Sequence, residues 1–536
     1  MRPRPSALVA FFLLPGCAGS CAPPDEDSGG PNAPIAVGDF ALGVEYTQLG
    51  LAEPYAAVGV GWAKTRLEAF EWGQSEPAAP VGGVHSYDWR CTDALILAYQ
   101  DAGIVNIQSY ISPRSAWGSV DAAGASPVDI APAPAFEADF RAWVHALIER
   151  YDGDGVDGAP GLRAGVHHWV VGPEWTGFWP SGNADDYIEF ATIVAEEARA
   201  ANPDVHLGAM PIFFADEFSG NEPNEAEIEA KMGAPYTLRN DNSGIEAILD
   251  HSELFDSISV HALGDYTELP PMLRWFRAQM ETRGYDHPIW LDDAFPAGLL
   301  ANGASYPTNY PVTAESYPEV YALLRALARG EAWEGYTPEE ALDWVLAYYG
   351  AHTVKKVITT LGEGASGIMI GNTEDWMFDE GASLRDAQVF LIGGAAAMGM
   401  TEVNHDGGYD ICDEREAGAA RPALSNIGLL VDFLGVEAFD EVERIGGNEG
   451  ARGYALRREG GSRWVLWNED GELHLPGDPA EAVLRYELAV PAGVEALRVT
   501  RAVTVAGAAV EDETVPVAEG VAVLELSSTP LLIVPD

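Results

Sequence analysis

The sequence predicts an α/β protein in which a (β/α)8 TIM barrel is followed by a C-terminal β-sandwich. Within residues 37–435, short apolar segments alternate with longer segments of helical periodicity, which is typical of β-α-β units and a parallel sheet. From residue 436 to 536 the helical periodicity stops, and short β-rich segments are separated by Gly, Asp and Pro, as in a β-sandwich. The 536 residues are also too many for one hydrophobic core.

The barrel is expected to contain eight strands with helices between them. An open, doubly wound sheet is the alternative, but it would normally have a glycine-rich phosphate loop after an early strand, and this sequence has none there. The expected helices are 89–102, 136–151, 184–201 and 338–361. The expected strands are 41–46, 63–70, 104–110, 166–172, 205–210, 255–261, 288–293 and 367–371.

The first 17 residues have the layout of a lipoprotein signal peptide, in which a basic start precedes a short apolar segment. They end in the sequence LPGC, which resembles the bacterial lipobox and makes Cys17 the expected lipidated residue. Cys21 is an alternative acceptor, and ordinary cleavage with free secretion is the other interpretation. Residues 18–36 are rich in Pro, Asp, Gly and Ser and predict a flexible tether. We therefore expect an exported lipoprotein of the outer membrane or cell surface.

The charge excludes several classes of partner. The chain has 30 Lys and Arg against 83 Asp and Glu, which gives a formal net charge of −53 at pH 7. Such a surface repels nucleic acids and anionic membranes, so membrane contact is expected only through the lipid anchor. Neutral carbohydrates remain suitable substrates or ligands. No redox or organic cofactor is implied by any motif.

The cysteine count does not indicate a disulfide scaffold, because only four cysteines occur. Besides the two near the N-terminus, these are Cys91 and Cys412. They form a disulfide if they meet in an oxidising compartment, and otherwise remain reduced and buried. The sequence leaves both alternatives open.

Acidic and aromatic residues lie where the barrel strands are expected to end, which is where barrel enzymes hold their working residues. Glu174 follows the strand 166–172, and Asp293 ends the strand 288–293. One carboxyl group that donates a proton and a second that attacks or activates water are what glycoside cleavage needs. Aromatic rings near the mouth would stack on sugar rings. The candidate sugar-binding residues are Trp62, Trp117, Trp175, Trp179, His261, Trp290 and Trp376.

Residues 38–435 resemble the clan A retaining glycoside hydrolases, a group that includes β-glucosidases, β-xylosidases and endoglycanases. The sequence HHWVVGPEWTGFW is similar to the family motif W-x-x-G/W-N-E-P, and PIWLDD is similar to P-I-W-I-T-E. SVHAL resembles a segment whose His lines the site. The resemblance implies Glu174 as the general acid/base, Asp293 as the nucleophile or base, and His261 as a lining residue.

Two residues depart from the family pattern. Pro173 replaces the Asn that precedes the acid/base, and it offers neither a side-chain donor nor a backbone N–H. Asp293 stands where the family has Glu, so its carboxylate is withdrawn by about 1.5 Å, the length of one C–C bond. The alternative to a hydrolase is therefore a catalytically inactive, glycan-binding barrel. By strand alternation, Asp292 is expected to face the opposite side from Asp293.

The segment YDGDGVDG has the spacing of a calcium loop, with Asp152, Asp154 and Asp157 as candidate ligands for a structural Ca²⁺. A complete EF-hand would also need a bidentate Glu further on, and that residue is absent. An acidic surface loop is the alternative interpretation.

Overall fold

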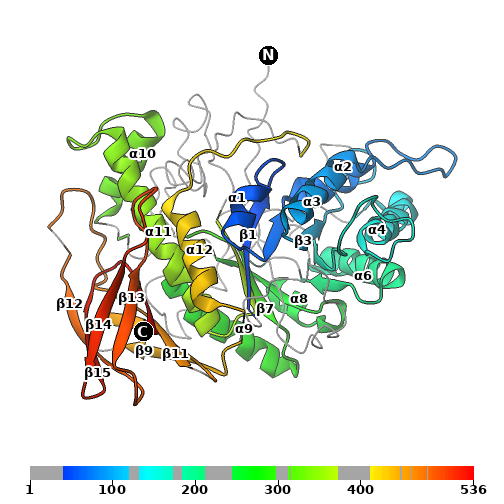
Figure 1. Ribbon diagram of the computed structural model, residues 1–536. Coiled ribbons are helices and arrows are strands. Elements are labelled where there is room, and N and C mark those ends of the chain that lie inside the picture. Colours follow the sequence, from blue (N-terminus) through cyan, green and yellow to red (C-terminus); the bar gives the residue numbers. More distant parts are fainter. Residues whose placement is uncertain are drawn as a thin grey trace.

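The computed structural model describes most of the chain from residue 40 onward. A barrel region of helices and parallel strands lies beside a smaller antiparallel β region (Figure 1). The described residues are 40–119, 132–172, 184–209, 212, 244–262, 264–296, 312–313, 315–371, 411–436, 438–446, 450–459, 461–479 and 481–536.

The parallel strands form a closed barrel. Hydrogen-bonded neighbours follow the order β5-β4-β3-β2-β1-β8-β7-β6. The two outer strands of this order are joined by the parallel bridges Gly208–Ser257 and Ile212–Val260, and the N–H of His261 donates to Ile212 O at 2.8 Å. The strands are β1 (Ala41–Thr47), β2 (Trp62–Thr65), β3 (Asn106–Ile111), β4 (His168–Val171), β5 (His206–Gly208), β6 (Ile258–Ala262), β7 (Ile289–Ala294) and β8 (Gly367–Ile370).

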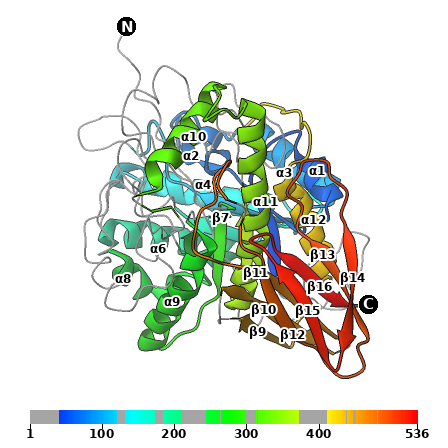
Figure 2. The same ribbon diagram turned by 90° about the vertical axis from the view of Figure 1, so that its left-hand side faces the viewer.

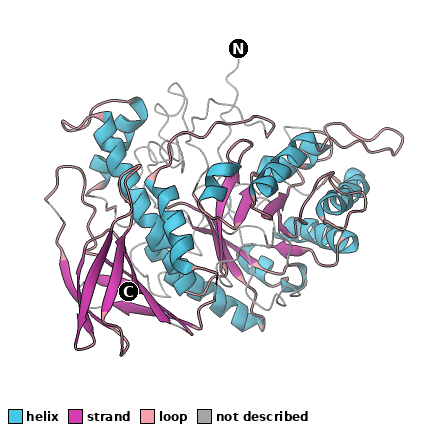
Figure 3. Ribbon diagram, in the orientation of Figure 1, coloured by secondary structure: helices cyan, strands magenta, loops and turns pink. Residues whose placement is uncertain are grey.

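Helices surround the barrel, so the predicted fold class is confirmed (Figure 3). The α-helices are α1 (Ala52–Ala57), α2 (Trp72–Ser75), α3 (Arg90–Ala102), α4 (Glu137–Tyr151), α6 (Ala184–Ala201), α8 (Gly244–Leu249), α9 (Leu269–Arg283), α10 (Tyr317–Arg329), α11 (Pro338–Gly362) and α12 (Pro422–Leu434). The short 3-10 helices are η1 (Leu67–Phe70), η2 (Pro134–Phe136), η3 (Ser252–Leu254) and η4 (Tyr266–Glu268).

The four helices expected from periodicity begin and end within one residue of their predicted bounds, because the sequence carries clear stop and start signals. Gly103 ends α3 in the left-handed conformation, at φ 106°, which glycine adopts without a Cβ clash. Thr337 starts α11 with a capping box, in which its hydroxyl accepts from the N–H of Glu340 and the Glu340 carboxylate accepts from the N–H of Thr337.

The second strand is shorter than predicted. The sequence indicates a strand over 63–70, whereas β2 ends at Thr65 and the chain continues as the turn η1. Phe70 at the end of that turn is fully buried, and its ring lies 5.1 Å from that of Trp169. An apolar run of this length does not distinguish a strand from a helical turn, and tertiary packing decides between them.

Bulky side chains fill the barrel interior at the N-terminal ends of the strands. Trp62 and Trp290 meet edge to face, with their ring centroids 4.9 Å apart. The ring of His168 lies 4.8 Å from that of Trp62, and Met369 and Ala41 pack against Trp290. This end of the barrel is therefore a packed core, which leaves the opposite end for chemistry.

The antiparallel region is a β-sandwich of eight strands in the order β12-β15-β14-β13-β16-β11-β10-β9 (Figure 2). One end of β14 pairs with β13 and the other with β15, so this strand passes from one layer to the other. The strands are β9 (Glu441–Gly446), β10 (Ala451–Arg458), β11 (Gly461–Asn468), β12 (Leu484–Ala489), β13 (Ala496–Arg501), β14 (Asp512–Ala518), β15 (Val521–Leu526) and β16 (Leu531–Pro535).

A buried asparagine joins the barrel to the sandwich. The side-chain amide of Asn426 on α12 donates to Gly350 O at 2.7 Å and to Val503 O at 2.9 Å. Its side-chain oxygen accepts from the N–H of Val503 at 2.7 Å. Every polar atom of this side chain is thus hydrogen-bonded, as a buried amide requires, and α11, α12 and the sandwich are held together.

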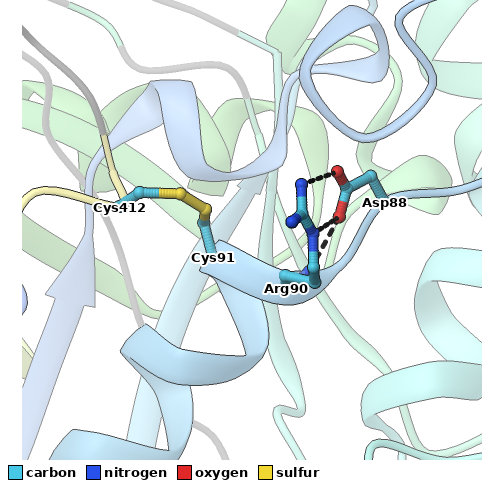
Figure 4. Close-up of a disulfide and its surroundings, with 4 residues drawn as sticks. All are labelled: Asp88, Arg90, Cys91 and Cys412. Carbon is cyan, nitrogen blue, oxygen red and sulfur yellow. Dashed lines mark hydrogen bonds and ion pairs between the residues drawn. A yellow bond between two sulfur atoms is a disulfide. The ribbon is translucent and has the colours of Figure 1, made fainter.

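Cys91 and Cys412 form a disulfide, which settles the alternative that the sequence left open (Figure 4). The bond joins the first turn of α3 to the segment before α12, across 321 residues of sequence. Beside it, the guanidinium of Arg90 donates to the carboxylate of Asp88 at 2.7 and 2.8 Å. A disulfide of this kind persists in an oxidising compartment.

Among the described residues, none of the helices combines the length and the apolar character needed to cross a bilayer.

We predict that removing the disulfide destabilises the barrel without changing its fold. The variant C91S should lose about 2–5 kcal/mol of unfolding free energy, because the cross-link restricts the unfolded chain. Denaturant unfolding of C91S and of the wild type, each with and without a reductant, measures this. The reductant should destabilise only the wild type; equal curves for all four samples would contradict the prediction.

Candidate functional site

The barrel mouth, where the strands reach their C-terminal ends, holds buried charged and polar side chains. Val44, Ala63 and Val260 face outward into the core beneath the helices. Because side chains alternate along a barrel strand, the residue after each of them faces the interior. These inward-facing residues are Glu45 on β1, Lys64 on β2 and His261 on β6, and each is at most 1% exposed.

Glu45 and Lys64 form an ion pair between neighbouring strands, and both side chains are fully buried. The Lys64 ammonium also lies 4.9 Å from the centre of the Tyr110 ring on β3, within range of a cation–π interaction. Burial raises the pKa of Glu45 well above its ordinary value, and the charge of Lys64 opposes that rise. The cost of desolvating both charges makes such a pair a weak source of stability. Because the pair also lies at the barrel mouth, we consider it a candidate for substrate binding.

His261 is held as a neutral imidazole. Burial lowers its pKa well below the ordinary value, and the positive charge of Lys64 lowers it further. A neutral imidazole offers one N–H donor and one acceptor nitrogen. Such a group can hydrogen-bond a sugar hydroxyl without introducing a charge.

Asp293 lies at the C-terminal end of β7 and is fully buried. The pairing of β7 with both β6 and β8 shifts by one residue around it, which is the mark of a β-bulge. Its backbone has a φ of 49°, in the left-handed region that few residues other than Gly, Asn and Asp adopt. Bulges often occur beside active sites, because the extra residue re-aims a side chain.

The bulge removes the basis for the prediction about Asp292. Strict alternation would place its side chain opposite to that of Asp293, but the register shift between Asp292 and Ala294 interrupts the alternation. The sequence contains no signal of this extra residue.

Four predicted site residues lie outside the described residues: Glu174, Trp175, Trp179 and Trp376. Their assignments stay predictions. The described chain does reach the mouth on this side, since the N–H of Gly172, directly after β4, donates to Ile111 O at 3.0 Å.

Two tryptophans predicted at the mouth lie elsewhere. Trp290 and Trp62 both occupy the packed N-terminal end of the barrel, where Trp290 is 2% exposed, so neither is placed to stack on a sugar there. Trp62 begins its strand rather than following it, and Trp290 comes only one residue after the start of its own strand. Trp117 does follow a strand, β3, but its ring packs on Trp72 and Phe136 and its indole N–H donates to a backbone oxygen.

The predicted calcium loop does not gather its carboxylates around a common point. The carboxylate of Asp152 accepts from the N–H of Asp154 at 3.0 Å, and that of Asp154 accepts from the N–H of Val156 at 2.6 Å. These are local turns of the Asx kind. No set of side chains suited to a metal ion occurs among the described residues, and these three aspartates are among them.

Sequence reasoning missed the pair of Glu45 and Lys64, although a signal was present. Each is a charged residue within an otherwise apolar or small strand, and the residue before it, Val44 or Ala63, belongs to the hydrophobic core. A charge at an inward-facing position of a barrel strand is costly to bury, and that pattern could have identified both residues.

The turn after β6 connects the mouth to the sandwich. The hydroxyl of Tyr266 donates to the carboxylate of Glu469 in the loop after β11, and the indole N–H of Trp467 donates to that hydroxyl at 2.9 Å. The ammonium of Lys355 on α11 lies 3.5 Å from the same carboxylate. The sandwich therefore fixes the turn that directly follows the strand of His261.

Asp265 in this turn is buried and titrates near neutrality. Burial raises its pKa from 3.8 to about 6, and the charge of Glu469 adds to the rise. One of its oxygens accepts from the N–H of Thr267 at 2.9 Å, and the other lies 3.5 Å from Nε2 of His352. Burial keeps the pKa of His352 well below its ordinary value, so His352 contributes no positive charge to this contact at neutral pH.

No family model and no curated protein matches this sequence. Among solved structures, a family 39 glycoside hydrolase from the gut symbiont Bacteroides cellulosilyticus WH2 is similar, with a TM-score of 0.50 and 13% identity over 94% of this chain and 82% of the other. A glucosidase from Croceicoccus marinus is similar with a TM-score of 0.50 and 14% identity, over 94% of this chain and 97% of the other.

The chain has the fold of these two enzymes. The resemblance to clan A glycoside hydrolases is therefore confirmed at the level of fold. Identities this low carry no residue roles and no substrate, which have to be argued from the site itself.

We predict that Asp265 makes the protein less stable as the pH rises from about 4 to 6. Its pKa in the folded state, about 6, exceeds the ordinary value of 3.8, so over this window the folded protein holds a proton that the unfolded chain releases. The loss should total about 3 kcal/mol of unfolding free energy.

Denaturant unfolding across this pH range measures the slope. D265N should remove the part that Asp265 contributes, because the amide does not titrate and can still accept from Thr267. The exposed variant D154N serves as the control and should keep the wild-type slope. A slope in D265N equal to that of the wild type would contradict the assignment.

Proposed function

We propose that this protein is a glycoside hydrolase that cleaves O-glycosidic bonds of a poly- or oligosaccharide, with Glu174 as general acid/base and Asp293 as nucleophile or base. The observation that carries the proposal is Asp293, a buried carboxyl group on a bulge at the C-terminal end of β7 in a barrel with a glycoside hydrolase fold. The neutral His261 and the charged Lys64 at the same mouth supply hydrogen-bonding groups for sugar hydroxyls.

In this mechanism, Glu174 protonates the glycosidic oxygen as the bond to the anomeric carbon breaks. Asp293 either attacks that carbon to form a glycosyl-enzyme, or removes a proton from the water that attacks it. The first course needs the two carboxyl groups about 5–5.5 Å apart and retains the anomeric configuration, whereas the second needs about 6.5–9.5 Å and inverts it.

The second candidate function is a catalytically inactive barrel that binds glycans at the cell surface. It is favoured by the two sequence departures, Pro173 beside the acid/base and Asp in place of Glu at 293. Its mark is saturable glycan binding without turnover, and a D293E variant that gains hydrolysis would support it.

We predict that E174Q and D293N each lower kcat on a cleaved glycan by at least about 10²-fold, since each removes a group that transfers a proton or attacks in the transition state. A broad panel of poly- and oligosaccharides, read out by reducing-end release, identifies the substrate. E253Q, an exposed matched variant, should retain full activity. Hydrolysis that survives in E174Q would exclude the proposed acid, and a panel without any hydrolysis would favour the binding barrel.

We also propose that the mature protein is anchored through lipid on Cys17 and works at the outer membrane or cell surface. The lipobox-like sequence supports this, and the disulfide fits an oxidising compartment. Carbohydrate is the expected partner, and the net charge of −53 opposes nucleic acid.

We predict that the protein expressed in a bacterium partitions into the detergent phase, and that C17S partitions into the aqueous phase. Mass spectrometry of the N-terminal peptide should find acyl chains on Cys17. C21S is the matched control and should remain in the detergent phase. Lipid on Cys21 alone would move the anchor to that residue, and unmodified peptide would indicate free secretion.

A further inference from the structure

Lys356 on α11 is a buried lysine whose ammonium group is surrounded by backbone carbonyl oxygens. Nζ donates to Ala262 O, to Gly264 O at 2.7 Å and to Phe295 O at 2.7 Å. All three protons of the ammonium therefore have an acceptor, which a buried charge requires. The side chain is fully buried.

The three carbonyl groups belong to the ends of the two strands that carry candidate site residues. Ala262 follows His261 at the end of β6, and Gly264 begins the turn after it. Phe295 follows β7, two residues beyond Asp293. Beyond these points the two strands no longer pair with each other, since their last register pair is Ala262 with Ala294. Lys356 thus ties together two strand ends that sheet hydrogen bonds no longer hold.

Asp293 needs such a constraint. A left-handed φ of 49° in a residue other than glycine costs on the order of 1–3 kcal/mol and persists only where the surroundings enforce it. Pairing with β8 holds the strand immediately before and immediately after Asp293, at Asp292 and at Ala294. Beyond Ala294 this pairing ends, and the hydrogen bond from Lys356 to Phe295 O fixes the backbone two residues after Asp293.

The ammonium is also part of a buried group of charges. Burial lowers the pKa of Lys356 from 10.5 to about 8, and the charges of Glu268, Asp265 and Asp293 oppose that fall. The other titratable groups close by are Lys355 and His352 on α11 and Glu469 from the sandwich. Lys356 is therefore mostly protonated at neutral pH, and its positive charge favours the ionised form of the nearby Asp293.

We propose that Lys356 is a positioning residue of the active site, which holds the strand ends bearing His261 and Asp293 and favours the carboxylate form of Asp293. This inference rests on the proposed function as a glycoside hydrolase.

The adjacent Lys355 provides a matched control. It is equally buried, at 2% exposed, but its ammonium pairs with Glu469 of the sandwich, 3.5 Å away. Removing either lysine deletes one buried cation from the same turn of α11. Only removal of Lys356 takes hydrogen bonds from the two strand ends.

The test compares the pH dependence of kcat and kcat/KM in the wild type, K356Q, K356R and K355M. K356Q keeps two N–H donors but loses the charge, so the acid limb of kcat/KM should move up by about one pH unit as the pKa of Asp293 rises. K356R keeps the charge but cannot fit the three-carbonyl site, so its acid limb should stay in place while kcat falls by about 10²-fold. K355M should keep the acid limb of the wild type, because Lys355 pairs with Glu469 and donates to neither strand end.

A second measurement does not depend on turnover. Thermal unfolding of K356Q, D293N and the double variant K356Q/D293N forms a double-mutant cycle. Because the charges attract, the double variant should lose less thermal stability than the two single losses combined. If the wild type hydrolyses no glycan, the proposed function fails, and this cycle still decides whether Lys356 and Asp293 interact.

Additive losses in the cycle would overturn the inference. So would an acid limb of K356Q that coincides with that of the wild type, or a K355M variant that reproduces the changes seen in K356Q. Circular dichroism shows whether K356R folds. If it does not, the shift in the acid limb of kcat/KM in K356Q and the double-mutant cycle still decide the inference.

Discussion

The barrel mouth depends on the compensation of charges that are buried where the parallel strands end. Each ion removed from water costs several kcal/mol even after relaxation, and a partner or a set of hydrogen bonds has to offset that cost. Glu45 and Lys64 compensate each other across β1 and β2. Lys356 is compensated by three carbonyl oxygens and by the carboxylates around it. These arrangements leave little freedom for the residues that they contact.

The two ends of the barrel use the same geometry in opposite ways. At the N-terminal end, inward-facing positions hold Trp62, Trp290 and Met369, which fill the interior at no electrostatic cost. At the C-terminal end, the corresponding positions hold Glu45 and Lys64, although apolar residues would pack there more cheaply. Stability alone does not favour buried charges. The charged residues at the C-terminal end of the barrel are therefore explained by a role in binding or chemistry.

Part of this architecture could be predicted from sequence, since helix periodicity and caps place four of the barrel helices within one residue. The motif PIWLDD also brings Asp293 to the end of β7, where the structure has it. What could not be predicted arises from tertiary pairing. The bulge at Asp293 is set by the register of β7 against its neighbours. The three carbonyl acceptors of Lys356 lie at or just after the ends of two strands that are far from it in sequence, so no local pattern reveals them.

The bulge also affects how the Asp at position 293, where the family has Glu, should be interpreted. An aspartate in place of glutamate withdraws the carboxylate by about 1.5 Å if the backbone stays where it was. The backbone does not follow a regular strand here, because Asp293 is the extra residue of a bulge and has a left-handed φ. A comparison of side-chain lengths alone therefore does not decide whether the carboxylate reaches the anomeric carbon. The conformation of residue 293 decides it, and that conformation depends on the contacts of the two strand ends with α11.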